Sequence, residues 1–270
     1  MKRSTKLLFL LLTLILFAIF INLKTPEIIG KVTNGENFVY ANVTRVVDGD
    51  TIDSSIGKIR FLGINTPEKS ESLYSDAKNL TTNLIDKKEI KVIFGEEKTD
   101  MYGRNLGFIF IGNEFVNAEL VRAGLASTFY MESLPTEFRN KLKSAEDEAR
   151  NNERGIWGKS ENSCIVVEKL SYVEDKSDLT SEFILFKNNC NYDVSMNGWK
   201  IKDEATHIYV FKNFIFMKNS EMKFVTGNCA NTNSQICWNQ KTPIWNDAGD
   251  QMFLKDASGK LAAYYDYRKI

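Results

Sequence analysis

Short apolar segments separated by polar turns fill the chain from residue 43 to residue 111, a pattern typical of β-strands. The predicted strands cover residues 43–47, 51–53, 58–62, 89–94 and 105–111. An Asp-Gly pair at Asp48 and Gly49, and a glycine at Gly57, mark the turns between the first three segments. We therefore predict a β-rich unit in this part of the chain.

Apolar residues at helical spacing predict three helices in the same region. The first apolar stripe consists of Tyr74, Ala77, Leu80 and Leu84. A second helix is predicted over residues 115–123 and a third over residues 135–152. Ser133 is the expected cap of the third helix and Gly155 its expected stop. Five strands with three helices fit an α+β unit on a five-stranded OB-type barrel, with Trp157 packed in its core.

From residue 164 onward the helical spacing disappears. Short runs rich in Val, Ile, Phe and Tyr recur there between Asn, Asp and Gly turns, which predicts an all-β sandwich. Trp199 and Trp245 are expected in its core or at its corners. Asp247 and Asp250 could bind calcium, but turns between strands explain them more simply.

A long apolar segment, residues 7–23, follows the basic residues Lys2, Arg3 and Lys6. Its length is close to the minimum for a bilayer span and exceeds the usual apolar core of a signal peptide. We predict an uncleaved signal anchor in the membrane. Because positive charge precedes the segment, its amino end should stay inside and the rest of the chain should lie at the cell surface. The alternative is a cleaved signal peptide and a secreted protein.

The chain is long enough for two domains of ordinary size after this segment. The predicted parts are a signal anchor or signal peptide at residues 1–23, a linker at 24–40, the barrel unit at 41–160 and the β-sandwich at 161–270. The 35 Lys and Arg balance the 35 Asp and Glu, so the net charge is zero. This balance argues against strong nonspecific binding to polyanions. If the chain binds nucleic acid, the binding should depend on residues at one site and not on overall charge.

All four cysteines lie in the predicted sandwich. An even number of cysteines in an exported chain predicts disulfides. The sequence has no Cys-x-x-Cys pair and only one histidine, His207, which argues against a zinc site and against histidine-based catalysis. Four cysteines allow three pairings. We predict that Cys164 pairs with Cys190, because the two residues should lie at level ends of adjacent antiparallel strands. Cys229 would then pair with Cys237 and close a local loop.

Three polar motifs carry the candidate chemistry. They are Val46-Val47-Asp48-Gly49-Asp50-Thr51, Arg60-Phe61-Leu62-Gly63-Ile64-Asn65-Thr66-Pro67-Glu68 and Asp100-Met101-Tyr102-Gly103-Arg104. Cutting a phosphodiester requires neutralised phosphate charge, a positioned water and a supported leaving oxygen. Two arginines, several side-chain oxygens and a free glutamate can supply these. Taken singly, each motif has a simpler explanation, because Asp-Gly is a common hairpin turn and an arginine is often a surface charge.

In these motifs the chain resembles the staphylococcal nuclease (thermonuclease) family over roughly residues 42–157. The resemblance extends to Leu120-Val121-Arg122-Ala123-Gly124-Leu125-Ala126 and to Gly155-Ile156-Trp157. It implies a Ca²⁺ site made by Asp50, Asn65 and the backbone carbonyl of Thr66. The family usually has aspartate at the position of Asn65. An amide oxygen still suits calcium, but the site loses one negative charge, so Mg²⁺ or another divalent cation is an alternative.

The same resemblance implies roles in catalysis and substrate binding. Glu68 would be the general base, and Arg60 and Arg104 would hold the phosphate. Tyr102 and Tyr130 fall at positions that contact a bound nucleotide in the family.

The predicted sandwich resembles the lamin-tail domain over roughly residues 164–267, which implies an immunoglobulin-like fold. The residues that carry this resemblance are Glu182-Phe183-Ile184-Leu185-Phe186-Lys187-Asn188, Met196-Asn197-Gly198-Trp199-Lys200-Ile201-Lys202-Asp203 and Ile244-Trp245-Asn246-Asp247-Ala248-Gly249-Asp250. We expect this unit to act in adhesion or positioning, and its partner stays open.

Two functions fit the sequence. The leading hypothesis is an exported, membrane-anchored endonuclease that hydrolyses DNA or RNA with a calcium-type cofactor. The alternative is a catalytically weak or inactive surface module that binds nucleic acid or protein. A binding module has no need of the full set Asp50, Arg60, Glu68 and Arg104, which favours the enzyme. Asn65 favours the alternative.

Overall fold

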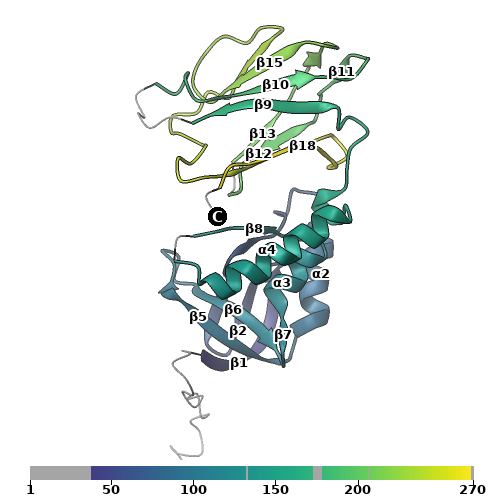
Figure 1. Cartoon of the computed structure of the whole chain (residues 1–270). Coiled ribbons are helices and arrows are strands. Elements are labelled where there is room, and N and C mark those ends of the chain that lie inside the picture. Colours follow the sequence, from purple (N-terminus) through teal and green to yellow (C-terminus); the bar gives the residue numbers. More distant parts are fainter. Residues whose placement is uncertain (1–37, 132, 173–177, 206, 269–270) are drawn as a thin grey trace, which may run out of the picture.

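The computed structural model describes residues 38–131, 133–172, 178–205 and 207–268. The predicted signal anchor or signal peptide, residues 1–23, and most of the predicted linker lie outside the described residues. Within these ranges, no helix combines the length and the apolar character needed to cross a bilayer. We refer to residues 38–160 as the barrel half and to residues 161–268 as the sandwich half (Figure 1).

The barrel half is built on five strands that close on themselves. They are β1 (Phe38–Asp48), β2 (Thr51–Ser54), β3 (Gly57–Phe61), β5 (Glu89–Thr99) and β6 (Asn105–Ile111). They pair in the order β3-β2-β1-β5-β6, and parallel pairing of β3 with β6 closes the barrel. This confirms the predicted five-stranded barrel. Three two-residue strands complete the half: β7 (Glu114–Phe115), which pairs with β6, and the pair β4 (Ile64–Asn65) and β8 (Ser127–Thr128).

Strand β1 begins earlier than its sequence pattern predicts. The prediction started at residue 43, but Phe38, Val39 and Tyr40 already pair with β5. The rings of Phe38 and Tyr40 meet edge to face at 5.7 Å, and Lys91 of β5 lies over the Phe38 ring. These contacts extend the strand into residues that were expected in the linker.

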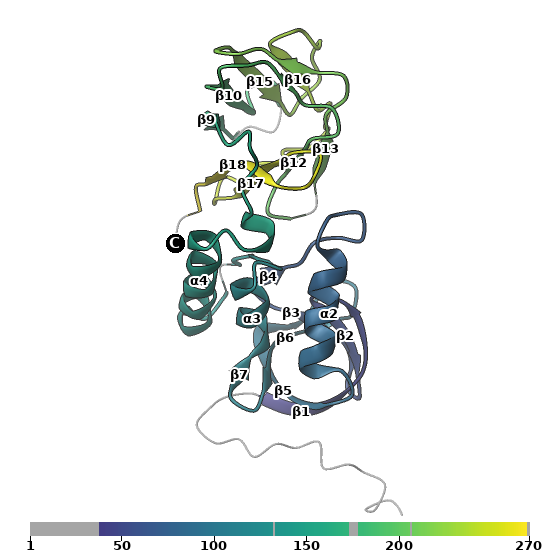
Figure 2. The same cartoon turned by 90° about the vertical axis from the view of Figure 1, so that its right-hand side faces the viewer.

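Three α-helices lie against the barrel: α2 (Tyr74–Ile85), α3 (Val116–Arg122) and α4 (Thr136–Asn151) (Figure 2). Their positions agree with the prediction, but both predicted end signals of α4 are wrong. Pro135, not Ser133, is the N-cap residue, since its restricted φ suits the entry to a helix. At the other end Glu153, not Gly155, takes the first left-handed conformation, with φ 53°.

Gly155 instead allows two loops to touch. It begins the 3-10 helix η1 (Gly155–Trp157) with φ 54°, and Gly124 after α3 has φ 69°. A Cβ atom on Gly155 would lie 2.1 Å from the carbonyl oxygen of Gly124, and one on Gly124 would lie 2.1 Å from that of Arg154. Only glycine fits such an approach. The contact fixes η1 against the end of α3.

The sandwich half contains two main sheets. The first consists of β9 (Ile165–Ser171), β10 (Phe183–Asn188), β15 (Glu221–Val225) and β16 (Gln235–Cys237). The second consists of β12 (Lys200–Lys202), β13 (Ile208–Val210), β17 (Gln251–Lys255) and β18 (Leu261–Asp266). A small pair is formed by β11 (Val194–Ser195) and β14 (Ile215–Phe216). Trp199 and Trp245 are buried in the core of this half, as predicted. The β-rich architecture is consistent with an immunoglobulin-like domain.

Both predicted disulfides are confirmed. Cys164 is bonded to Cys190 and Cys229 to Cys237, and the described residues include no free cysteine. Strands β9 and β10 are antiparallel with Ile165 opposite Asn188, so Cys164 and Cys190 lie just beyond the paired ends. The second bond spans a sequence separation of 8 and closes the loop that leads into β16.

The two halves meet where β17 and β18 face α4 and η1 (Figures 1 and 2). Trp157 of η1 is buried and packs against Phe253 and Tyr264, with ring centres 5.6 and 5.1 Å away. Trp157 is a core residue as predicted, but the cluster that it joins is separate from the barrel core and contains residues of both halves.

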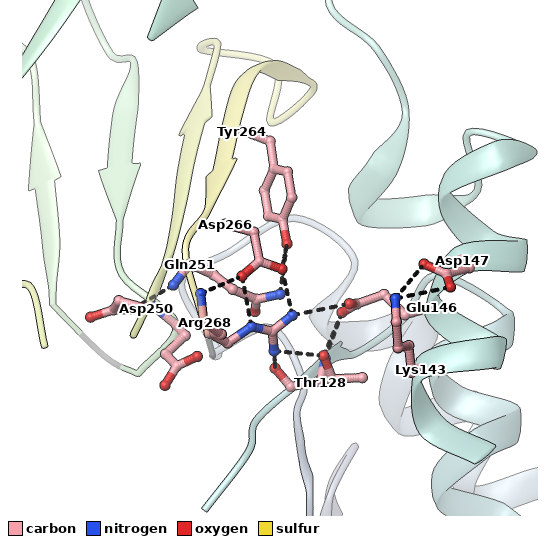
Figure 3. Close-up of polar contacts among 10 residues, drawn as sticks. Thr128, Lys143, Glu146, Asp147, Asp250, Gln251, Tyr264, Asp266 and Arg268 are labelled. Carbon is pink, nitrogen blue, oxygen red and sulfur yellow. Dashed lines mark hydrogen bonds and ion pairs between the residues drawn. The ribbon is translucent and has the colours of Figure 1, made fainter. Parts of the chain in front are cut away.

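Arg268, just after β18, extends this interface (Figure 3). Its guanidinium pairs with Glu146 of α4 at 3.3 Å and with Asp266 of its own half at 2.7 Å. It also donates to the hydroxyl of Thr128 at 2.9 Å. The side chains of Arg268 and Glu146 are 6% and 3% exposed. The ion pair across the interface is therefore buried.

Candidate active site

A buried carboxylate, Asp50, organises the candidate site. It follows the turn after β1 and is buried. Its Oδ2 accepts hydrogen bonds from the N–H and the hydroxyl of Thr66, at 2.8 and 2.9 Å. Its Oδ1 accepts from the hydroxyl of Thr51 at 3.2 Å. Asp50 thus ties the segment after β4 to the β1–β2 turn and joins two of the three sequence motifs.

Arg60 is placed beside this carboxylate by strand pairing, because Thr51 of β2 lies opposite Arg60 of β3. Its Nη1 is 3.2 Å from Oδ2 of Asp50 and donates to the carbonyl of Phe61 at 2.8 Å. Its Nη2 donates to Oδ1 of Asn65. The guanidinium is therefore fixed between Asp50, with which it forms an ion pair, and Asn65, to which it donates a hydrogen bond.

Asn65 has a second partner in the sandwich half. Its Nδ2 donates to the backbone carbonyl of Glu204 at 2.7 Å. The amide thus accepts from Arg60 and donates to Glu204 at the same time. An aspartate would accept from Arg60 equally well, but it would place a carboxylate oxygen against the Glu204 carbonyl. This contact is a physical reason for asparagine at this position.

Asp48 adds negative charge next to Asp50. Burial and the neighbouring Asp50 carboxylate raise the pKa of Asp48 to about 6. The ligand atoms available here are carboxylate, amide and carbonyl oxygens, which suit a hard divalent cation. Across the described ranges, no group of three or more His, Cys, Asp or Glu side chains is placed to hold a metal ion.

Glu68 lies two residues beyond Thr66 and is exposed. Its backbone N–H donates to Oε2 of Glu71 at 2.9 Å. In the part of the chain that the structure describes, its carboxylate forms no hydrogen bond or ion pair. The carboxylate is therefore free to meet a water molecule or a substrate.

Arg104 lies in a separate turn. Its Nε is 2.6 Å from Oδ2 of Asp100, whose Oδ1 accepts the N–H groups of Tyr102 and Arg104, both at 2.9 Å. Tyr102 is 75% exposed, and its ring centre is 5.4 Å from the guanidinium carbon of Arg104. Arg104 directly precedes β6, whose Leu106 lies opposite Arg60. Arg60 thus lies on β3 and Arg104 at the entry to the neighbouring strand β6, and among the described residues they share no partner.

Tyr130 lies at the interface between the halves. Its ring centre is 4.5 Å from the guanidinium carbon of Arg268 and 5.7 Å from that of Arg139. Burial raises the pKa of its hydroxyl to about 12. The structure thus gathers Asp50, Arg60, Asn65 and Thr66, whereas Tyr130 contacts the sandwich half. The nucleotide contact of Tyr130 stays a prediction.

Sequence reasoning missed three residues that adjoin the site, Glu71, Lys202 and Glu204. Oε2 of Glu71 is 2.8 Å from Nζ of Lys202, across 131 residues of sequence. Glu204 contacts Asn65 across 139 residues. Contacts this distant leave no periodic or local signal in a sequence.

The space between the halves is nearly filled beside the site. A cavity of about 20 Å³, enough for roughly one water molecule, remains there. Its lining includes Asn65, Thr66 and Glu71 from the barrel half and Lys202, Phe253 and Lys255 from the sandwich half. A larger cavity of about 780 Å³ lies between α4 and the edge formed by β9 and β18, and no predicted catalytic or metal-binding residue lines it.

Comparisons with known proteins agree with this division of the chain. Residues 58–159 match the family model described as "Staphylococcal nuclease homologue", and residues 159–269 match "Lamin Tail Domain". The thermonuclease of Staphylococcus intermedius is 30% identical over 134 residues, which cover 46% of this chain and 77% of the relative. The thermonuclease of Staphylococcus hyicus is 26% identical over 168 residues, 58% of this chain and 98% of the relative. The prophage-derived endonuclease YokF of Bacillus subtilis is 27% identical over 136 residues, 46% of each chain.

Proposed function

Because this chain belongs to the staphylococcal nuclease family and continues into a lamin tail domain, we propose that it is an endonuclease that hydrolyses phosphodiester bonds of DNA, RNA or both. Relatives named thermonuclease and endonuclease support a nuclease activity. The observation that carries the proposal is the cluster in which Arg60 and Thr66 contact the buried Asp50 and Asn65 contacts Arg60. The Glu68 carboxylate, which has no partner among the described residues, lies two residues beyond Thr66.

The proposed chemistry assigns one task to each group. The Glu68 carboxylate takes a proton from the attacking water, because it is exposed and has no competing partner among the described residues. Arg60 and Arg104 neutralise the charge that builds on the phosphate oxygens, and Arg donors suit this geometry. Tyr102, exposed beside Arg104, would contact the nucleotide.

The carboxylate of Asp50 and the amide and carbonyl oxygens beside it are ligand atoms that suit a divalent cation, and we propose calcium, with magnesium as the alternative. Asp50, Asn65 and the carbonyl of Thr66 would hold it. Burial is the main cause of the raised pKa of Asp48, and the Asp50 carboxylate adds to it, so two acidic side chains lie close together beside the proposed cation position. When bound, the cation supplies Lewis-acid polarisation of the phosphate.

A digestion assay tests the proposal. Protein beginning at Phe38 is mixed with plasmid DNA or with RNA in the presence of calcium, magnesium or a chelator. We expect cleavage that requires an added divalent cation and stops with the chelator. Binding without cleavage under every metal condition would instead support the non-catalytic surface module.

The charge of the metal site can be tested at Asn65. In Asn65→Asp the added carboxylate should lower the calcium concentration that gives half-maximal cleavage, because ligand charge sets affinity. The same change removes the hydrogen bond to Glu204, so the free energy of unfolding should fall by about 1–3 kcal/mol. Calcium titrations and urea unfolding measure the two effects.

The control for this variant is Asn152→Asp, which removes an amide-to-carbonyl hydrogen bond on α4, remote from Asp50. It should leave the calcium titration unchanged. An unchanged or raised calcium requirement in Asn65→Asp would contradict the assignment of Asn65 as a metal ligand.

We also propose that the enzyme works outside the cell, anchored in the membrane by residues 7–23. The two disulfides support an oxidising compartment. Protease added to intact cells should then digest the barrel half. Full protection until lysis would contradict this orientation.

A further inference from the structure

The direction of the Glu68 carboxylate depends on the backbone of its own turn, because the side chain has no partner among the described residues. The Glu68 N–H donates to Oε2 of Glu71 at 2.9 Å, and the Glu71 N–H donates to the Glu68 carbonyl at 2.7 Å. These two bonds close a ring around the turn. Any group that holds the Glu71 side chain therefore also restrains Glu68.

Glu71 is held by the sandwich half. The oxygen that accepts from Glu68, Oε2, is also 2.8 Å from Nζ of Lys202. The Glu71 and Lys202 side chains are only 6% and 13% exposed. Two residues earlier on β12, Lys200 donates from Nζ to the carbonyl of Ser70 at 3.2 Å. Because alternate residues of a strand share a face, both lysines project from one face of β12 onto the turn.

The charges around Glu71 favour this arrangement. Burial alone would raise the pKa of Glu71, but attraction to Lys202, hydrogen bonds from Lys202 and the Glu68 N–H, and the charge of Lys255 together lower it. Glu71 is therefore ionised and accepts from both partners. Removing Lys202 would leave the buried carboxylate without its hydrogen-bonded partner and with only the weaker attraction of Lys255, so it would reorganise to reach water.

We propose that Lys202 is a positioning residue for phosphodiester hydrolysis, acting through Glu71 to set the direction of the Glu68 carboxylate. The sandwich half then contributes a residue that supports the active site of the barrel half, in addition to any separate role of its own. This inference rests on the proposed nuclease function. It differs from a docking role, because a lysine that only held the halves together would affect stability and leave turnover by the folded protein unchanged.

The test compares Lys202→Met, Lys202→Arg and the control Lys218→Met, an exposed lysine elsewhere in the sandwich half. Kinetics on an oligonucleotide are measured well below each melting temperature. We expect Lys202→Met to lower kcat by about tenfold to a hundredfold, because small misplacements of a reacting group are costly, with KM changed less than about twofold. Lys202→Arg should recover most of the loss, since a guanidinium can also pair with Glu71. Lys218→Met should match the parent.

Hydrogen exchange of the Glu68 amide gives a second readout that does not need activity. We expect faster exchange in Lys202→Met and near-parental exchange in Lys202→Arg. If the parent protein cleaves no nucleic acid, the proposed function fails, and exchange still shows whether Lys202 restrains Glu68. Unchanged kcat in folded Lys202→Met, a change in KM alone, or unchanged exchange would overturn the proposal. If Lys202→Met does not fold, Glu71→Gln replaces it, with the same fall in kcat expected and the same outcomes against it.

Discussion

Glu68→Gln is expected to lower kcat by about a hundredfold to ten-thousandfold and to leave the protein folded. Glutamine has the shape of glutamate but cannot accept the proton of the attacking water. The Glu68 side chain is exposed and has no partner among the described residues, so its loss removes no packing. The measurement is single-turnover cleavage of a labelled oligonucleotide at saturating calcium, with circular dichroism to verify the fold.

The matched control is Glu89→Gln, an exposed glutamate at the start of β5 on the barrel. It makes the same chemical change away from Asp50 and should cleave at the parental rate. Near-normal cleavage by Glu68→Gln would remove the general-base assignment. A similar loss in both variants would point to a charge effect on substrate binding.

The largest expected effect on stability belongs to Arg268→Met. We expect the free energy of unfolding to fall by about 3–5 kcal/mol, because the substitution leaves the Glu146 carboxylate buried without its partner. The Glu146 side chain is 3% exposed, and Oε1 already accepts from the N–H and hydroxyl of Thr128 (Figure 3). Equilibrium urea unfolding followed by tryptophan fluorescence measures the loss.

Arg122→Met provides the comparison. Arg122 also pairs with two carboxylates, Glu119 and Glu148, but its side chain is 37% exposed. Surface ion pairs of this kind are worth about 1 kcal/mol or less, so this variant should lose little. If Arg122→Met and Arg268→Met lowered the free energy of unfolding equally, burial of the ion pair at the interface would make no extra contribution to stability.

The members of the candidate site could be predicted from the sequence because their motifs follow the order seen in the staphylococcal nuclease family, and strand pairing shows how the fold brings some of them together. Thr51 and Arg60 pair across β2 and β3, and the ordered motifs bring Thr66 back to Asp50. Local sequence signals predicted the ends of α4 wrongly, because Ser133 was expected to be its N-cap residue and Gly155 to end it. Pro135 is the N-cap residue instead. Glycine is required at position 155 because the backbone there lies so close to Gly124.

The contacts between the halves could not be predicted in this way. Glu71 meets Lys202 and Asn65 meets Glu204 through tertiary packing, and no periodicity couples residues that far apart. The departure of Asn65 from the usual aspartate was visible in the sequence, but its physical reason, a carbonyl facing the amide, required the fold. Tyr130 likewise matched a family position, yet its neighbour Arg268 was not foreseeable.

The span of these contacts bears on the order in which the protein folds. The bonds from Arg268 to Thr128, Asn65 to Glu204 and Lys202 to Glu71 join residues 140, 139 and 131 positions apart. Closing loops of this length costs entropy before the contact stabilises anything, and domains fold as units before they dock. During refolding, cleavage should therefore appear later than the circular dichroism signal of the barrel, and simultaneous recovery would argue against this order. A chain whose sandwich half has not yet docked would hold a formed barrel with an unsupported Glu68, so we expect full activity only at the last step of assembly.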